Sequence, residues 1–168
     1  MDVTQIVLRH AVLSDAEALS KFMNTLADEN LDTISGVRTT PAEEVALFEK
    51  AAKNGRAFRL IALDTDEVIG LLGLWAGEQA HSRDAARLGM SVLSPYRGQG
   101  IGRKLMKAAI DETKKWPSFC RIELEVVPWN KPAIHLYESL GFVREGVKRK
   151  AANYGGKPTD SALMALVW

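Results

Sequence analysis

The spacing of apolar and polar residues along the chain predicts alternating strands and helices. Alternation and short apolar runs bounded by turn residues indicate strands, whereas apolar residues three and four positions apart indicate amphipathic helices. The patterns predict the order β-α-α-β-β-β-α-β-α-β-β, with strands over residues 5–10, 58–63, 68–75, 86–93, 121–127, 143–150 and 161–168. With 168 residues, this order predicts one α/β domain, 1–168, around a mixed sheet of about seven strands.

Capping residues and helix breakers predict where four helices begin and end. Ser14-Asp15-Ala16-Glu17 has the pattern of a capping box at the start of the first helix. Thr40-Pro41 is typical of an N-cap followed by the first helical residue. The third helix follows a glycine-rich stretch and ends before Pro117, and the fourth spans 131–140. A loop over 154–158 is expected between the last two strands.

Charge and cysteine usage narrow the class of protein. A formal net charge of +1 argues against nucleic acid or a membrane surface as the main partner. The sequence has no apolar run long enough to span a bilayer, and its first residues lack the pattern of a signal peptide. Cys120 is the only cysteine, so we expect a small core residue in a reducing compartment rather than a disulfide. These features predict a cytoplasmic protein.

Metal chemistry is not indicated by the sequence. His10, His81 and His135 are far apart and belong to no paired ligand spacing. The chain also lacks a Ser-His-Asp or Cys-His signature. We therefore expect no metal.

The stretch from Tyr96 to Arg103, Tyr-Arg-Gly-Gln-Gly-Ile-Gly-Arg, carries the clearest chemical signal. Its three glycines lie where a predicted strand leads into a helix, so side chains do not block the N–H groups there. Unpaired N–H donors and the partial positive charge of a helix N-terminus favour a phosphate or pyrophosphate. The spacing fits neither a P-loop nor the dinucleotide fingerprint, because residue 103 is Arg where each needs Gly. Anion binding and simple capping of the helix both remain open.

Two motifs in this order resemble the GCN5-related N-acetyltransferase (GNAT) family. The first, Arg97-Gly98-Gln99-Gly100-Ile101-Gly102, is similar to the pyrophosphate motif of that family. The second is similar over Leu124-Glu125-Val126, Asn130, Ala133-Ile134 and the run Leu-Tyr-Glu-Ser-Leu-Gly-Phe at 136–142. The resemblance covers nearly the whole chain and implies the GNAT fold, in which the fourth and fifth strands splay apart.

Two residues of this chain favour such a splay. Gly89 weakens the fourth strand and predicts a bulge or a close backbone approach. Pro128 removes a ladder donor just after the fifth strand. A gap between the two strands is therefore expected near these residues.

The resemblance further implies that the chain uses acetyl-CoA as acyl donor. In the family the pyrophosphate lies on the glycine loop, and the fourth strand binds the pantetheine arm as an added strand would. The resemblance implies that Asn130 contacts the cofactor, and the same residue is also suited to be the N-cap of the fourth helix. The cofactor-binding residues implied are Ser91, Val92, Leu93, Arg97, Gly98, Gln99, Gly100, Ile101, Gly102, Arg103, Asn130 and Tyr137.

Two residues are candidates for catalysis. Tyr137 matches the general acid of the family, which protonates the departing thiolate. Glu125 lies twelve residues earlier, the spacing of base and acid in bacterial enzymes that acetylate a ribosomal-protein alanine. An amine must lose a proton before it attacks, since an alkyl ammonium has a pKa of about 10.4. Tyr137 packing on the sheet, and Glu125 as a solvated strand residue with water as the base, are the alternatives.

The leading functional hypothesis is acetyl transfer to a small primary amine, such as an amino acid or a related metabolite. The alternatives are N-terminal protein acetylation and a non-catalytic acyl-CoA-binding module. The acidic residues Asp28, Glu29 and Asp32 fall in an expected polar loop, where they either attract a cationic amine or are solvated. The apolar last strand, ending in Val167-Trp168, suggests that two chains pair or pack there in a homodimer.

Overall fold

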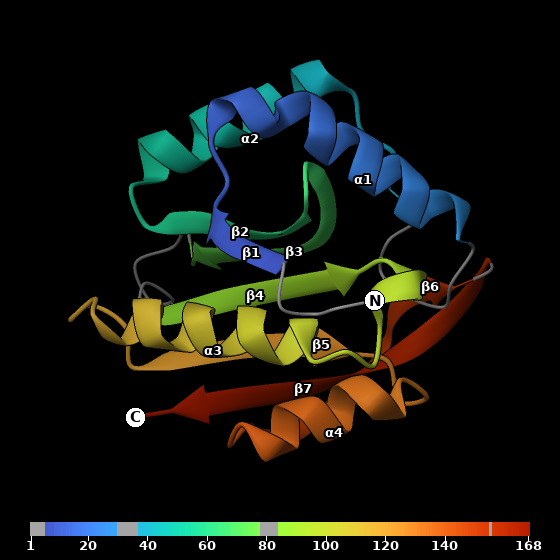
Figure 1. Ribbon diagram of the computed structural model, residues 1–168. Coiled ribbons are helices and arrows are strands. Elements are labelled where there is room, and N and C mark those ends of the chain that lie inside the picture. Colours follow the sequence, from blue (N-terminus) through green and yellow to red (C-terminus); the bar gives the residue numbers. More distant parts are fainter. Residues whose placement is uncertain (1–5, 30–36, 78–83, 155) are drawn as a thin grey trace.

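One mixed sheet forms the centre of the molecule (Figure 1). The computed structural model describes residues 6–29, 37–77, 84–154 and 156–168. The strands are β1 Ile6–His10, β2 Ala57–Asp64, β3 Glu67–Ala76, β4 Ala85–Val92, β5 Arg121–Val126, β6 Val143–Tyr154 and β7 Lys157–Val167. Their spatial order is β1-β2-β3-β4-β5-β7-β6, and in the described part of the chain only β4 and β5 pair in parallel.

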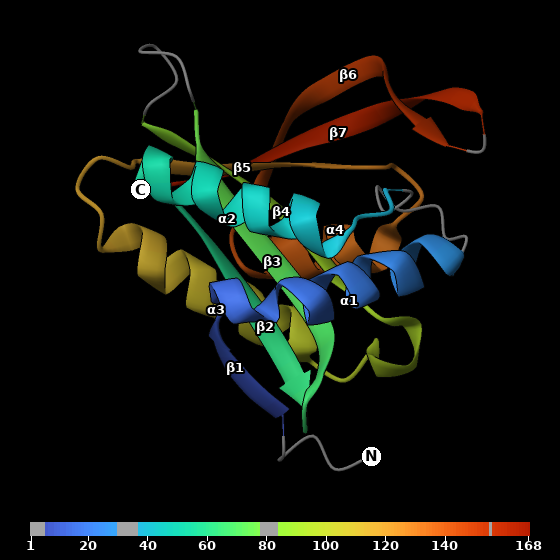
Figure 2. The same cartoon turned by 90° about the horizontal axis from the view of Figure 1, so that it is seen from above.

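Helices cover both faces of the sheet. They are α1 Ala16–Asp28, α2 Pro41–Asn54, α3 Ile101–Lys114 and α4 Lys131–Ser139. Figures 1 and 2 show α1 and α2 on one side of the sheet, with α3 and α4 on the other. The element order confirms the one expected from the sequence.

Each face of the sheet has its own apolar core. Phe22 of α1 packs with Ile61 and Val68 beneath the first two helices. Leu105 of α3 packs with Ile122 and other residues of the larger core on the opposite face. Alternate residues of a strand therefore point to two different layers. None of the helices in the described ranges is both long and apolar enough to cross a bilayer.

β4 and β5 are paired at one end only. The parallel ladder joins residues 85–87 of β4 to residues 121–123 of β5 and contains no later pair. Meanwhile β5 continues its antiparallel ladder with β7 as far as Val126. The expected splay of the fourth and fifth strands is confirmed. We call the opening between residues 88–92 and residues 124–126 the fork.

Gly89 does not produce a bulge between β3 and β4, contrary to one of the two expectations. The β3–β4 register runs without a shift, and Gly73 lies opposite Gly89. The indole of Trp75 lies over both glycines, because its ring carbons are 3.8 and 3.7 Å from where a Cβ would lie on Gly73 and Gly89. A side chain rather than a backbone makes the close approach.

The last two strands are longer than expected. β6 and β7 pair as far as Tyr154 and Lys157, so most of the expected loop over 154–158 is strand. The ladder contains a register shift near Lys150, whose φ is 53° and whose N–H donates to Asp160 Oδ1 at 2.8 Å. Backbone bonds extend the hairpin through polar residues, and hydrophobic patterning does not reveal such pairing.

Two local expectations are wrong. Cys120 is exposed rather than part of the core, and its Sγ lies 3.6 Å from the carbonyl oxygen of Asp84. The start of the first helix depends on Asp15 rather than Ser14. The Asp15 carboxylate accepts from Val12 N–H at 2.7 Å and from Arg9 at 2.7 and 2.8 Å. A carboxylate can accept these three bonds, which a serine hydroxyl cannot do.

We expect Asp15→Asn to lower the free energy of unfolding by about 1–3 kcal/mol at pH 7, because a charge-assisted pair joining β1 to α1 is lost. Hydrogen bonds from Arg9 hold the pKa of Asp15 below its usual value. That stabilisation is full above the unfolded pKa of about 3.9 and is lost as the pH falls through the folded value. Urea unfolding of both proteins between pH 7 and pH 3 measures it. A difference independent of pH would contradict the prediction.

Candidate active site

The segment from β4 to α3 forms an open, glycine-rich turn at one end of the fork. Gly98 and Gly100 have φ values of 73° and 81°, which L side chains rarely adopt. α3 begins directly after Gly100 without a side-chain cap, and its first intrahelical bond runs from Lys104 N–H to Gly100 O at 3.0 Å. The N–H groups of residues 101–103 precede that bond, so they point out of the helix toward any ligand there.

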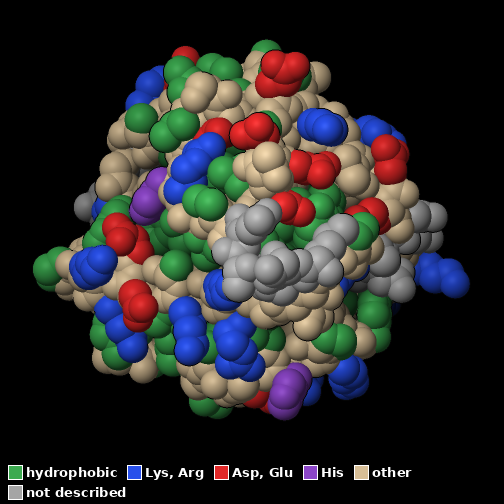
Figure 3. Space-filling view, viewed as in Figure 1, with side chains coloured by type: hydrophobic (Ala, Val, Ile, Leu, Met, Phe, Trp, Pro, Cys, Tyr) green, Lys and Arg blue, Asp and Glu red, His purple; other side chains and the backbone are tan. Residues whose placement is uncertain are grey.

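Basic side chains surround this turn. Figure 3 shows Lys and Arg side chains gathered over α3, which carries Arg103, Lys104 and Lys107 in its first half. The helix dipole adds a partial positive charge at the same end. The combination suits a ligand with several phosphate groups.

Arg97, at the start of the glycine-rich turn, holds that turn in position. Arg97 Nε donates to the carbonyl of Val92 at 2.8 Å, and its Nη2 is 3.1 Å from Glu29 Oε2. The same carboxylate accepts from the N–H and Oγ of Ser94 at 2.8 and 2.9 Å. Gln99 is also internally bonded, to Pro95 O at 2.9 Å. The side chains of Arg97 and Gln99 therefore hold the loop, while its backbone faces outward.

Backbone groups of β4 line the fork, but they are not all those expected. Leu93 donates its N–H to Ile69 O and accepts at its carbonyl from Tyr96 N–H, each at 3.0 Å. Successive residues of a strand direct these groups to opposite sides, so the N–H groups of Met90 and Val92 point away from β3 into the fork. Met90 was missed in the sequence, although the alternation along the strand indicates it.

The glycine turn, β4 and α4 meet closely. A Cβ on Gly102 would lie 3.2 Å from Met90 Cε and 3.4 Å from Leu136 Cδ2. Arg103 Nη2 donates to Ser139 Oγ of α4 at 2.9 Å. Asn130 caps α4 by accepting from Ala133 N–H at 3.3 Å, which bears out its N-cap reading. Gly102 thus lets α4 approach the turn, and α4 carries Tyr137.

Tyr137 is buried beside the fork and keeps its proton. It is 7% exposed, and its ring centroid is 5.9 Å from that of Phe142. Burial raises the pKa of Tyr137 to about 12. Among the described residues, its hydroxyl has no hydrogen-bond partner. The ring of Tyr137 therefore packs in the core, as one of the two alternatives from the sequence predicts. Its hydroxyl remains available to donate a hydrogen bond.

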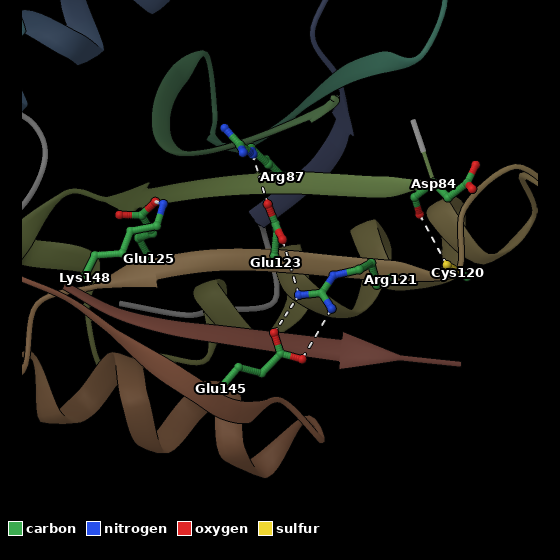
Figure 4. Close-up of polar contacts among 8 residues, drawn as sticks. All are labelled: Asp84, Arg87, Cys120, Arg121, Glu123, Glu125, Glu145 and Lys148. Carbon is green, nitrogen blue, oxygen red and sulfur yellow. Dashed lines mark hydrogen bonds and ion pairs between the residues drawn. The ribbon is translucent and has the colours of Figure 1, made fainter. Parts of the chain in front are cut away.

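Glu125 lies on the opposite face of the sheet from Tyr137. The alternation of β5 places Glu125 on the same face as Glu123, whereas Leu124 points into the core that contains Tyr137. Glu125 Oε1 is 2.5 Å from Lys148 Nζ of β6, and its side chain is 37% exposed (Figure 4). The two candidate catalytic residues therefore approach the fork from opposite sides.

A chain of ion pairs crosses the sheet where the fork begins (Figure 4). Arg87 Nε is 3.0 Å from Glu123 Oε1, and Arg121 Nη2 is 3.3 Å from Glu123 Oε2 and 2.7 Å from Glu145 Oε2. The hydrogen bonds that Arg121 donates to Glu145 raise the pKa of Arg121. These partners are 24 and 36 residues apart along the chain, so the sequence alone does not pair them.

The expected acidic loop is only partly available to a ligand. Asp28 pairs with Arg38, and Glu29 is occupied by Arg97 and Ser94. Asp32 and His81 lie outside the described residues. Within the described part of the chain, no group of three or more His, Cys, Asp or Glu side chains is arranged to hold a metal ion.

Comparison with known proteins agrees with this geometry. A family model described as "Acetyltransferase (GNAT) family" matches residues 22–142. The L-amino acid N-acetyltransferase AaaT of Escherichia coli (strain K12) is 28% identical over 165 residues, covering 98% of this chain and 99% of that protein. The ribosomal protein bS18-alanine N-acetyltransferase of the same organism is 34% identical over 97 residues, 58% of this chain and 65% of that protein.

Solved structures share the fold. An acetyltransferase of the GNAT family from Streptococcus pneumoniae has a TM-score of 0.89 and 27% identity, covering 97% of this chain and 99% of that chain. The putative acetyltransferase yncA from Salmonella typhimurium, solved with acetyl-CoA, has a TM-score of 0.86 at 20% identity and covers 98% and 94%.

Replacing Tyr137 with Phe should leave the phenol titration of the folded protein unchanged below about pH 10, because that is two pH units below the Tyr137 pKa of about 12, where only ~1% of the phenol is ionised. Absorbance at alkaline pH, compared between wild type and Tyr137→Phe, measures the difference. A Tyr137-dependent ionisation near the ordinary pKa of about 10 would contradict its burial.

Proposed function

The chain belongs to the GNAT acetyltransferase family, and we propose that it moves the acetyl group of acetyl-CoA directly to the primary amine of a small molecule, an amino acid or a related metabolite. The fork is the observation that carries the proposal. It has an anion-binding turn at one end, a free phenol on one side and a carboxylate on the other. The similarity to AaaT over almost the full length of both chains supports an amino acid as acceptor.

The donor is proposed to lie along the turn and the fork. The pyrophosphate accepts from the N–H groups of residues 101–103, and the basic side chains of α3 balance its charge. The pantetheine arm enters the fork and bonds to the N–H groups of Met90 and Val92 as an added strand would. Gly98 and Gly100 have open space where a Cβ would lie, so phosphate oxygens can approach the backbone.

Tyr137 is proposed to stabilise the leaving sulfur. The amine attacks the thioester carbon, and collapse of the tetrahedral intermediate breaks the carbon–sulfur bond. A phenol with a pKa of about 12 is a weaker acid than a thiol with a pKa of about 8.5, so its main contribution is a hydrogen bond to the developing thiolate. The ammonium proton released in the same step balances the charge on sulfur.

Glu125 is proposed to receive, on the other face, the separate proton that the ammonium form of the acceptor loses before it attacks. Its partial exposure gives the proton a route to water, and Lys148 holds the carboxylate in place by pairing with it. An acid and a base on opposite faces of one gap can act on opposite sides of one carbonyl.

Acetylation of a protein N-terminus is the second candidate. The similarity to the bS18-alanine enzyme and the twelve-residue spacing of Glu125 and Tyr137 favour it. That similarity covers 58% of this chain, whereas the similarity to AaaT covers 98%. Release of the free CoA thiol with free amino acids and with peptides beginning in Ala or Ser compares the two. Peptides preferred over every free amino acid would overturn the leading proposal.

Tyr137→Phe should lower kcat about tenfold to a hundredfold while the Kd for acetyl-CoA stays within about twofold, because only the hydrogen bond to sulfur is lost. Steady-state kinetics and calorimetry measure the two quantities. Unchanged kcat would remove Tyr137 from the mechanism. Undetectable turnover by the wild type, with acetyl-CoA still bound, would instead indicate a non-catalytic binding module.

Glu125→Gln should lower kcat/KM for the amine about tenfold or more at pH 7. The loss should shrink as the pH rises, because a larger fraction of the amine is then already neutral. Glu138→Gln, an exposed carboxylate on α4, is the matched control and should behave as wild type. A pH-independent loss would assign Glu125 a structural role.

A further inference from the structure

We propose that the open face of the fork selects free α-amino acids with an apolar side chain. Trp75 contacts that side chain, Arg87 binds the carboxylate, and Glu125 faces the amine. This inference rests on the proposed acetyl transfer and names the class of acceptor. Trp75 and Arg87 are thereby specificity-determining residues.

Trp75 supplies an apolar surface at the edge of the fork. It is 45% exposed, although its indole is among the largest apolar groups on the sheet. The ring lies over Gly73 and Gly89, which face each other on β3 and β4 and have no side chains. An exposed aromatic surface held against a rigid backbone is typical of a ligand contact.

Arg87 supplies a cation beside that surface. The register places Arg87 directly opposite Trp75, on the same face of the sheet. Glu123 engages Nε of Arg87, and within the described residues the two terminal nitrogens of Arg87 bond to nothing. Glu123 uses its other oxygen for Arg121, so Arg87 is held in place while its two terminal nitrogens keep their four N–H donors for a ligand. A planar pair of N–H donors fits a carboxylate.

Glu125 completes the set two residues farther along β5. Arg87 and Glu123 are the last pair of the parallel ladder, so Glu125 lies about 6.6 Å beyond it, where the strands have already parted. An amino acid bound to Arg87 by its carboxylate therefore directs its amine into the fork, toward the thioester. Binding of an amino acid in this orientation would explain why the charged residues Arg87 and Glu125 lie beside the apolar surface of Trp75.

The same face disfavours the other acceptor classes. Arg87 and Arg121 would repel a polyamine, and the described acidic residues of the expected acceptor loop, Asp28 and Glu29, are already paired. A peptide N-terminus offers a neutral amide where Arg87 would bind a carboxylate, so it would not form that charge-assisted pair.

The first experiment compares L-leucine and L-phenylalanine with their amides as acceptors, at saturating acetyl-CoA. We expect the free acids to be preferred at least about tenfold in kcat/KM, because a site built for a carboxylate rejects its neutral analogue. Arg87→Gln should bring the ratio of acid to amide close to one without changing the KM for acetyl-CoA. An equal loss on acids and amides would mean that Arg87 only holds the strands together, and it would overturn the proposal.

The second experiment tests the indole. Trp75→Ala should reduce the preference for L-leucine over L-alanine, expected at about tenfold or more in the wild type, to near one. Trp168→Ala is the matched control, since that indole is 41% exposed and lies beside Lys114 at the far end of α3. A preference that survives in Trp75→Ala, or is lost equally in Trp168→Ala, would contradict the assignment.

The wild-type protein alone separates two kinds of failure. Turnover with peptides or spermidine but not with free amino acids would overturn this inference while leaving acetyl transfer intact. An absence of turnover with every amine would overturn the proposed function and the inference together.

Discussion

The separation of β4 from β5 is the constraint on which the site depends. A sheet that stayed paired along both strands would have its backbone groups satisfied and no room for a ligand. Here the ladder stops after Arg87 and Glu123, and the N–H groups of Met90 and Val92 are left without a strand partner. An extended pantetheine arm offers the polar groups that can satisfy them. The proposed binding site is therefore the part of the sheet where strand pairing is incomplete.

Neighbouring elements keep the opening from closing. On one side of the fork, β5 pairs with β7 over its whole length. On the other, Leu93 is fixed to Ile69, and Arg97 ties the glycine turn back to Val92 and to Glu29 of the α1 C-terminus. At the junction the ion pairs from Arg87 through Glu123 to Arg121 hold the last paired residues. The gap is thus maintained by contacts made elsewhere, and a donor need not open it.

The fold and the glycine turn could be predicted from the sequence because their signals are local. Strand periodicity, the Thr40 cap and the glycines at 98 and 100 each lie within a few residues of the feature they specify. Pairings across the sheet could not be predicted. The links of Glu125 to Lys148 and Arg97 to Glu29, and the indole over Gly89, join residues far apart in the chain. The prediction that Cys120 is a core residue was wrong for the same reason, because its exposure depends on which strands pack against the start of β5. The acceptor side is built almost entirely from such pairings.

A crystal structure with CoA bound tests the central claim most directly, because it shows which groups line the fork. The expected result is a pantetheine arm bonded to the N–H groups of Met90 and Val92, with its sulfur within hydrogen-bonding distance of the Tyr137 hydroxyl. CoA bound outside the fork, or a sulfur remote from Tyr137 with β4 and β5 paired beyond residue 87, would contradict it.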